Sequence, residues 1–139
     1  MIKVLFVCVH NSARSQIAET LLNDLGKGKF LAESAGLEPG VLNPFVIRAL
    51  NEVGYDISDN KTKSVFDFFK QDKTYDYVIT VCDGLNGEKC PVFPGNVTRL
   101  HWDFEDPKDF TGTDDEILVK TNFLIERMGE KILSFINSF

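Results

Sequence analysis

The chain contains few metal-binding side chains, no excess of positive charge and no long apolar run. Its three cysteines and two histidines form no Cys-x-x-Cys or paired-histidine motif, so the sequence does not indicate a zinc site. Lysine and arginine total 15 against 21 aspartates and glutamates, and the net charge of −6 argues against a nucleic-acid partner. No apolar stretch approaches the length that spans a bilayer. We therefore expect no metal, cofactor, nucleic-acid partner or membrane attachment.

The size and composition fit one folded domain. With 139 residues, of which 43% are hydrophobic, the chain can bury one sizeable core, and we expect a single domain over residues 1–139. Met1 leads directly into a strand pattern, without the pattern of a signal peptide. An odd number of cysteines without such a leader favours reduced thiols that serve chemistry. We therefore expect a cytoplasmic protein, and a monomer.

Short apolar strand patterns alternate along the chain with helical patterns. The predicted strands cover residues 3–7, 30–35, 77–81 and 97–102, and the predicted helices begin near residues 12, 43, 64 and 113. This alternation predicts an α/β fold of three layers, in which helices cover both faces of a four-stranded parallel sheet. The carboxyl ends of parallel strands meet at one edge of such a sheet, where ligands usually bind.

Capping residues and apolar stripes define the predicted helices. Asn43 followed by Pro44 is typical of a helix start, and Thr113 with Glu116 forms a capping box at the start of the last helix. The side chains that we expect on buried helix faces are Ile17, Leu21 and Leu25 in the first helix, Val46, Ile47, Leu50 and Val53 in the second, Val65, Phe68 and Phe69 in the third, and Ile117, Leu124, Met128, Ile132 and Ile136 in the last.

The segment from Cys8 to Ser15 follows the first buried strand and leads into a helix. In a strand-to-helix turn of this kind the backbone N–H groups converge on an anion, and the helix adds its positive end. Arg14 supplies a planar fork that matches two oxygens at once. The same positive field favours the thiolate of Cys8, to which Ser15 can donate a hydrogen bond. We predict that Cys8 is a nucleophile and that the oxyanion is held by residues of the loop, namely Val9, His10, Asn11, Ser12, Ala13 and Arg14.

Two further cysteines flank a polar loop that contains two glycines. Cys82 ends the third predicted strand, and Cys90 closes the loop. The two thiols can form a disulfide if the loop brings their Cα atoms within about 7 Å. On spacing alone, two unrelated thiols also fit.

An acidic segment follows the fourth predicted strand. Pro107 forces Asp106 out of helical geometry, and an aspartate on such a rim can protonate a leaving oxygen. Asp103 and Glu105 are local competitors for this role, and Asp106 also fits as a plain turn residue. Of the two histidines, the one in the anion loop is expected to point towards solvent, and the one in the fourth strand to have a hydrogen-bonded ring.

Together these residues resemble the thioredoxin-coupled arsenate reductases, which share the fold of the low-molecular-weight tyrosine phosphatases. The resemblance covers nearly the whole chain. The motifs that carry it are Cys8-x5-Arg14-Ser15-Gln16 followed by Ala18-Glu19, Ser34-Ala35-Gly36, Val81-Cys82 with Cys90-Pro91, and His101-Trp102 leading to Asp106-Pro107. The anion loop is shared by reductases and phosphatases, whereas the cysteine pair and the His-Trp segment are similar to the reductases.

The resemblance implies a sequence of thiol steps. Cys8 would attack arsenate held by the loop and Arg14, while Asp106 protonates the departing oxygen. Cys82 would then attack the Cys8 sulfur and release arsenite, and Cys90 would take over the disulfide with Cys82. Reduced thioredoxin would restore the thiols by exchange, and phosphate or sulfate would compete with arsenate for the loop.

Some relatives bind potassium beside this loop, through an acidic residue and positions that correspond to Asn11, Glu19 and Ser34. The matching region of this chain, residues 61–64, reads Lys-Thr-Lys-Ser. The resemblance therefore implies a lysine charge in place of the ion, and we expect no metal.

Two other functions remain open from the sequence. A phosphatase would use the same Cys8, Arg14 and Asp106 to form and hydrolyse a phosphocysteine. Phosphatases of this family place aromatic residues directly after the Asp-Pro pair, whereas Lys108 and Asp109 follow it here. An oxyanion-binding or redox-sensing module would keep the loop but would not require a reducible thiol pair.

Overall fold

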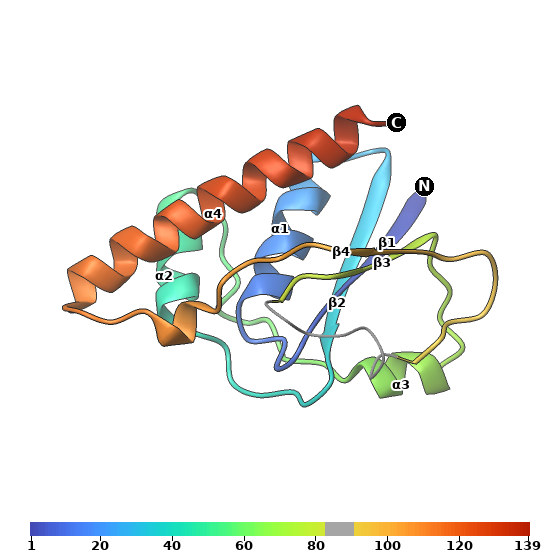
Figure 1. Ribbon diagram of the computed structural model, residues 1–139, viewed down its shortest axis with the longest axis horizontal. Coiled ribbons are helices and arrows are strands. Elements are labelled where there is room, and N and C mark those ends of the chain that lie inside the picture. The colour runs from blue at the N-terminus through green and yellow to red at the C-terminus, as the bar shows by residue number, and fades with distance from the viewer. Residues whose placement is uncertain (83–90) are drawn as a thin grey trace.

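The computed structural model describes residues 1–82 and 91–139, so Cys90 lies outside the described residues. Its strands are β1 (Ile2–Cys8), β2 (Phe30–Gly36), β3 (Tyr77–Thr80) and β4 (Thr98–His101). Its helices are α1 (Arg14–Leu25), α2 (Pro44–Glu52), α3 (Val65–Lys70) and α4 (Asp114–Asn137), with a short 3₁₀ helix η2 at Pro107–Asp109. The four strands are parallel and lie in the order β2-β1-β3-β4 (Figure 1), which confirms the expected sheet.

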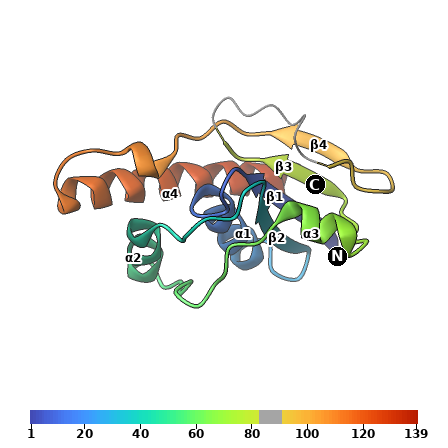
Figure 2. The ribbon, with the colours of Figure 1, turned by 90° about the horizontal axis from the view of Figure 1, so that it is seen from below.

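Helices cover both faces of the sheet, as the alternation of patterns predicts. α1, α2 and α4 pack against one face in the larger buried cluster. α3 lies on the other face, where Val65 and Phe68 cover Leu5 and Val78. Figure 2 shows α3 apart from the group that α1, α2 and α4 form. Because β1 is covered on both sides, its residues from Val4 to Cys8 are all buried, which explains why this strand is a continuous apolar run.

The register of the strands brings their carboxyl ends to one edge. Cys8 at the end of β1 is opposite Gly36, the last residue of β2. Val7 is opposite Thr80 in β3, so Cys82 lies just beyond the end of that strand. Thr80 is in turn opposite His101, the last residue of β4. The segments that follow β1, β3 and β4 therefore begin side by side.

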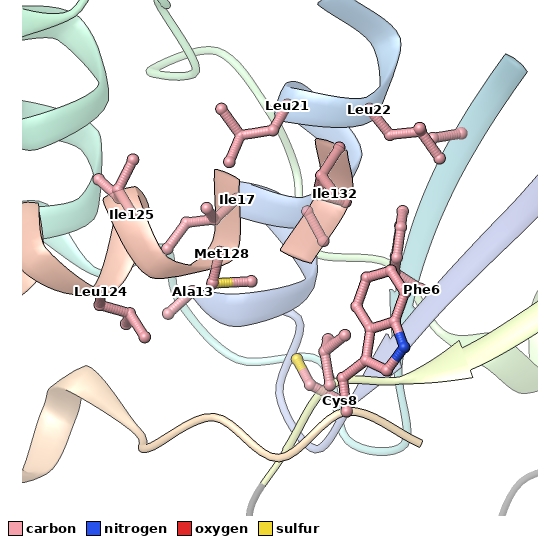
Figure 3. Packing of buried hydrophobic residues seen from close by; sticks show 14 of the residues in the cluster. Phe6, Cys8, Ala13, Ile17, Leu21, Leu22, Leu124, Ile125, Met128 and Ile132 are labelled. Atoms are coloured by element: carbon pink, nitrogen blue, oxygen red, sulfur yellow. The ribbon is translucent and has the colours of Figure 1, made fainter. Parts of the chain in front are cut away.

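The long helix α4 closes the core over α1. Figure 3 shows Ile17 and Leu21 of α1 facing Leu124 and Met128 of α4, with Cys8 at the margin of the same cluster. The anion loop therefore rests directly on the hydrophobic core. Burial of one such large aliphatic side chain contributes about 1.5–3 kcal/mol, so the core holds the loop in place.

Some helix residues that the patterns place in the core are exposed. Val53 is 58% exposed because α2 ends at Glu52, and Leu25 is 40% exposed at the last residue of α1. Phe69 is 42% exposed and makes an edge contact with Phe93, with ring centroids 5.9 Å apart. Near the ends of α4, Ile117 and Ile136 are only half-buried. The helix residues that are buried although the patterns do not place them in the core include Ala49, Leu118, Thr121, Ile125 and Phe135.

The predicted caps are confirmed. The side chain of Asn43 accepts hydrogen bonds from the N–H groups of Phe45 and Val46, and Pro44 is the first residue of α2. Thr113 and Glu116 form the expected reciprocal capping box at the start of α4. Across residues 1–82 and 91–139, the helices are too short or too polar to cross a bilayer.

The outer edge of β2 is bonded to other parts of the chain. Asn23 of α1 accepts a hydrogen bond from the N–H of Ala32 at 2.8 Å and donates one to its carbonyl at 3.0 Å. The N–H of Phe30 donates to Gly26, and the N–H of Gly36 donates to Lys63. These bonds occupy backbone groups that an edge strand normally leaves open.

Candidate active site

The loop between β1 and α1 leaves the start of the helix open to an anion. The N-cap residue of α1 is Ala13, whose side chain cannot accept a hydrogen bond, and no side chain caps the helix. The first N–H groups of a helix have no partner within the helix, and together with the helix dipole they attract negative charge. The first turn of α1 contains no acidic residue that would oppose an anion there.

Cys8 lies beneath this helix start with two hydrogen-bond partners. Its side chain is buried. The Sγ atom accepts a hydrogen bond from the backbone N–H of Asn11 at 3.2 Å, and it lies 2.9 Å from Oγ of Ser15. Hydrogen bonds to sulfur favour the thiolate over the thiol. The sequence prediction that Ser15 faces Cys8 is therefore confirmed in geometry.

Asn11 gives the loop its shape. Its φ of 54° places it in the left-handed region, which asparagine tolerates better than most residues. Its side chain is fully buried, donates from Nδ2 to Oγ of Ser15 at 2.7 Å and accepts at Oδ1 from Gln16 and from the N–H of Lys63. The sequence singled out Asn11 as a residue of the anion loop and as a position that corresponds to the potassium site of some relatives, and Gln16 only as part of the motif.

Gly36 allows the loop to pass close to the end of β2. A Cβ atom at this position would lie 2.8 Å from the backbone N of Asn11 and 2.8 Å from the backbone O of Val9. Backbone atoms cannot swing away as a flexible side chain can. This close approach is the physical reason for glycine in the Ser-Ala-Gly motif.

Arg14 and Asp106 form the opposite wall of the site. The guanidinium donates to the carbonyl of Phe104 at 2.9 Å and to Oδ2 of Asp106 at 3.2 Å. Both side chains are largely buried, with exposures of 5% and 14%. Asp106 has the extended backbone that its proline neighbour predicts, and its Oδ1 accepts from the N–H of Lys108.

The two competing acids have other partners. Asp103 is bonded to the ring of His101, with Oδ1 2.6 Å from Nε2, and its side chain is 74% exposed. Glu105 is paired with Arg127 of α4. Of the three acids, the structure thus brings Asp106 to the arginine of the loop.

Both histidines have hydrogen-bonded rings. Nδ1 of His10 lies 2.9 Å from the carbonyl of Glu38, so the ring is held against the next loop and does not simply point to solvent. Nδ1 of His101 lies 2.6 Å from Oγ1 of Thr80, and its Nε2 is bonded to Asp103. The expectation for His101 is confirmed.

A second buried thiol lies at the same edge of the sheet as the first. Cys82 follows β3 and belongs to the same buried cluster as Cys8. The prediction that both thiols lie at one edge of the sheet is therefore confirmed for this pair. The predicted role of Cys90 falls on a residue outside the described part of the chain.

A lysine ammonium group lies beside the loop where the resemblance implies a cation. Nζ of Lys63 is 3.5 Å from Oε1 of Glu19 and 3.4 Å from Oγ of Ser34. Burial raises the pKa of Glu19, while Lys63 and the Ser34 hydroxyl lower it, and burial prevails. Within the described ranges, no cluster of three or more His, Cys, Asp or Glu side chains could hold a metal ion.

A hollow of about 400 Å³ opens beside the anion loop. Its apolar part is formed by Val41, Leu42 and Pro44, and its rim by His10, Ser12 and Lys108. No Phe, Tyr or Trp is among these lining residues. Lys108, the residue after the Asp-Pro pair, lines this hollow.

The sequence pattern of the "Low molecular weight phosphotyrosine protein phosphatase" family matches residues 3–138. The chain belongs to this family.

Several curated relatives with similar sequences are arsenate reductases. The chain is 36% identical over 133 residues to the arsenate reductase of Shouchella clausii, and the aligned region covers 95% of this chain and 93% of that protein. It is also 36% identical over 132 residues to the arsenate reductase of Bacillus subtilis, with the same coverage.

Solved structures of this phosphatase family agree with these sequences. An arsenate reductase in its oxidised state superposes with a TM-score of 0.80 at 32% identity, over 99% of this chain and 98% of that chain. An arsenate reductase in a phosphate-binding state gives a TM-score of 0.74 at 30% identity, over 99% and 98%. A thioredoxin-dependent arsenate reductase of Corynebacterium glutamicum gives 0.63 at 33% identity, over 96% of this chain and 62% of that chain.

Proposed function

We propose that this protein reduces arsenate to arsenite through a relay of three thiols, those of Cys8, Cys82 and Cys90, and that thioredoxin regenerates the relay. The observation that carries the proposal is a second buried thiol, Cys82, at the same sheet edge as Cys8. A hydrolytic phosphatase needs only the first. The arsenate reductase names of the similar sequences and structures support the same reading.

The anion-binding step uses the uncapped start of α1. Arsenate would be held by the N–H groups of residues 9–14 and by the guanidinium of Arg14, whose planar fork suits two oxygens. The Cys8 thiolate attacks arsenic and forms an S–As bond, while Asp106 gives a proton to the departing oxygen, which leaves as water. The phosphate-binding state of a similar arsenate reductase supports an oxyanion in this loop.

The redox step transfers two electrons to arsenic. The Cys82 thiolate attacks the Cys8 sulfur, the S–As bond breaks with its electron pair on arsenic, and arsenite departs. A Cys8–Cys82 disulfide remains. Cys90 then attacks the Cys82 sulfur, which frees Cys8 and leaves a Cys82–Cys90 disulfide. A reduced dithiol protein restores both thiols by exchange.

Thioredoxin is the proposed reductant, since a similar structure is a thioredoxin-dependent arsenate reductase. A relay that must be reduced in every cycle requires a reducing compartment, and we therefore place the protein in the cytoplasm.

The phosphatase alternative shares the loop, Arg14 and Asp106. Two observations disfavour it as the main activity. Among the described residues, the hollow beside the anion loop is lined by Lys108 and aliphatic side chains, with no Phe, Tyr or Trp to stack against an aryl phosphate. Cys82, buried at the same sheet edge as the nucleophile, has no role in phosphoester hydrolysis.

The deciding experiment compares turnover with thiol variants. Arsenate-dependent NADPH oxidation is followed with thioredoxin and thioredoxin reductase for the wild type and for Cys8→Ser, Cys82→Ser and Cys90→Ser. Each variant is expected to lose multiple turnover. Phosphate-monoester hydrolysis, measured on the same proteins, should require Cys8 but neither Cys82 nor Cys90. Wild-type arsenate turnover by Cys82→Ser would refute the relay and favour the phosphatase.

A further inference from the structure

We propose that Gln16 is a positioning residue that, through Asn11, aims the hydroxyl proton of Ser15 at the Cys8 sulfur. The inference rests on Cys8 as the nucleophile of the proposed function. Gln16 touches neither the thiol nor the anion loop's open face, so its effect must pass through other side chains. These side chains are those of Asn11 and Ser15, which connect Gln16 to Cys8 by hydrogen bonds.

The orientation of the Gln16 amide is fixed by a backbone carbonyl. Gln16 lies in the first turn of α1 and is fully buried. Its Nε2 is 3.1 Å from the carbonyl oxygen of Lys61, which can only accept, so this atom must be the amide nitrogen. Its Oε1 accepts from Nδ2 of Asn60 at 3.1 Å. The segment of residues 60–61 therefore holds both ends of the Gln16 amide.

The Gln16 amide in turn orients Asn11. Its Nε2 also donates to Oδ1 of Asn11 at 3.1 Å, and the backbone N–H of Lys63 donates to the same atom at 2.9 Å. Two donors that converge on one atom require an oxygen there. The other end of the Asn11 side chain is therefore the NH₂ group, which lies 2.7 Å from Oγ of Ser15.

This orientation decides which way the Ser15 hydroxyl points. Because Asn11 donates to Oγ, the single hydroxyl proton of Ser15 must leave in another direction, and Sγ of Cys8 lies 2.9 Å away. Ser15 thus donates and Cys8 accepts, which stabilises the thiolate. With the Asn11 amide reversed, Ser15 would donate to Asn11 and the Cys8 thiol would donate to Ser15, which stabilises the uncharged form.

The experiment measures the pH at which half of Cys8 reacts with iodoacetamide. Every protein carries Cys82→Ser and Cys90→Ser, so that Cys8 is the only thiol, and no arsenate is used. Loss of a hydrogen bond to a charged group costs about 1.5–3 kcal/mol, so Ser15→Ala should raise the midpoint by about 1–2 pH units. Gln16→Leu removes one of the two donors to Asn11 and should raise it by roughly 0.5–1 unit.

A double variant separates positioning from a general structural effect. If Gln16 acts through Ser15, Gln16→Leu should cause no further shift in the Ser15→Ala background. Gln16→Glu, which keeps the shape but cannot donate to Asn11, tests the same point if the leucine variant folds poorly. Gln71→Leu is the matched control, because this glutamine is exposed at the end of α3, and its midpoint should equal that of the parent.

Two results would overturn the proposal. One is a folded Gln16→Leu or Gln16→Glu protein with the parent midpoint. The other is a shift that adds in full to that of Ser15→Ala. Failure of the proposed function would show in a separate measurement, as wild-type arsenate turnover by the Cys82→Ser protein, whereas the alkylation midpoint of Cys8 is measured without arsenate.

Discussion

Gly36→Ala changes the anion loop without touching any side chain of the site. The new Cβ atom would meet the backbone N of Asn11 and the backbone O of Val9, each at 2.8 Å. The φ of Gly36 lies outside the left-handed region, so alanine brings no backbone strain of its own. The variant therefore tests steric fit between the end of β2 and the loop alone.

The size of the effect follows from the distances. Ordinary contacts of a Cβ atom begin at 3.4 Å, so loop and strand must separate by about 0.6 Å. A misplacement of about 1 Å at a reacting centre can cost roughly 100-fold in rate, so we expect about a tenfold loss of kcat/KM for arsenate. The same crowding should lower the free energy of unfolding by about 1–3 kcal/mol.

The assay combines arsenate turnover, phosphate binding and denaturant unfolding. Gly129→Ala is the matched control, because its nearest neighbour is Cδ1 of Leu21 at 4.0 Å and it lies within α4. This control should be more stable by up to about 1 kcal/mol, with unchanged turnover and phosphate affinity. A Gly36→Ala protein with wild-type phosphate affinity and turnover would refute the steric account of this glycine.

Two other predictions concern charges around the loop. Asp106→Asn should lower kcat for arsenate by about 100-fold or more with little change in KM, because the amide can still accept a hydrogen bond from Arg14 but cannot donate a proton to the departing oxygen. An unchanged kcat would show that another residue acts as the general acid. Lys63→Met removes the cation that lowers the pKa of Glu19, so this pKa should rise further. A carboxyl group with a raised pKa binds its proton more tightly in the folded state, so stability falls as pH rises through that pKa. The free energy of unfolding in urea should therefore be lower for Lys63→Met than for wild type by about 1–2 kcal/mol at pH 8 and by less at pH 5. A double variant with Glu19→Gln should lose this pH dependence. Equal losses of stability at both pH values would contradict the pairing of Lys63 with Glu19.

Local chemistry was enough to predict the fold and the first thiol. The alternation of strand and helix patterns determines the parallel sheet, and the turn after β1 can be recognised because Cys8, Arg14 and Ser15 lie close together in the sequence. The exposed Val53 and Phe69 were assigned to the core, because periodicity does not show where a helix ends or how much of its last turn a neighbour covers.

Contacts between distant segments could not be read from the sequence. The choice of Asp106 over Asp103 and Glu105 depends on which of them reaches Arg14, and only the packed rim decides this. The same holds for Gln16, whose partners in residues 60–63 are brought to it by the fold. The signal in the sequence is the position of Gln16 directly after Ser15 in the Cys8-x5-Arg14-Ser15-Gln16 motif.

The bonds that Asn23 makes to the edge of β2 limit how this protein can associate. Strand addition requires a run of open N–H and C=O groups, and here the outward-facing groups of Ala32, together with the N–H groups of Phe30 and Gly36, are already taken. A partner that donates a β-strand would find this edge interrupted at alternate positions. Asn23 thus disfavours the addition of a strand from another chain at this edge of the sheet.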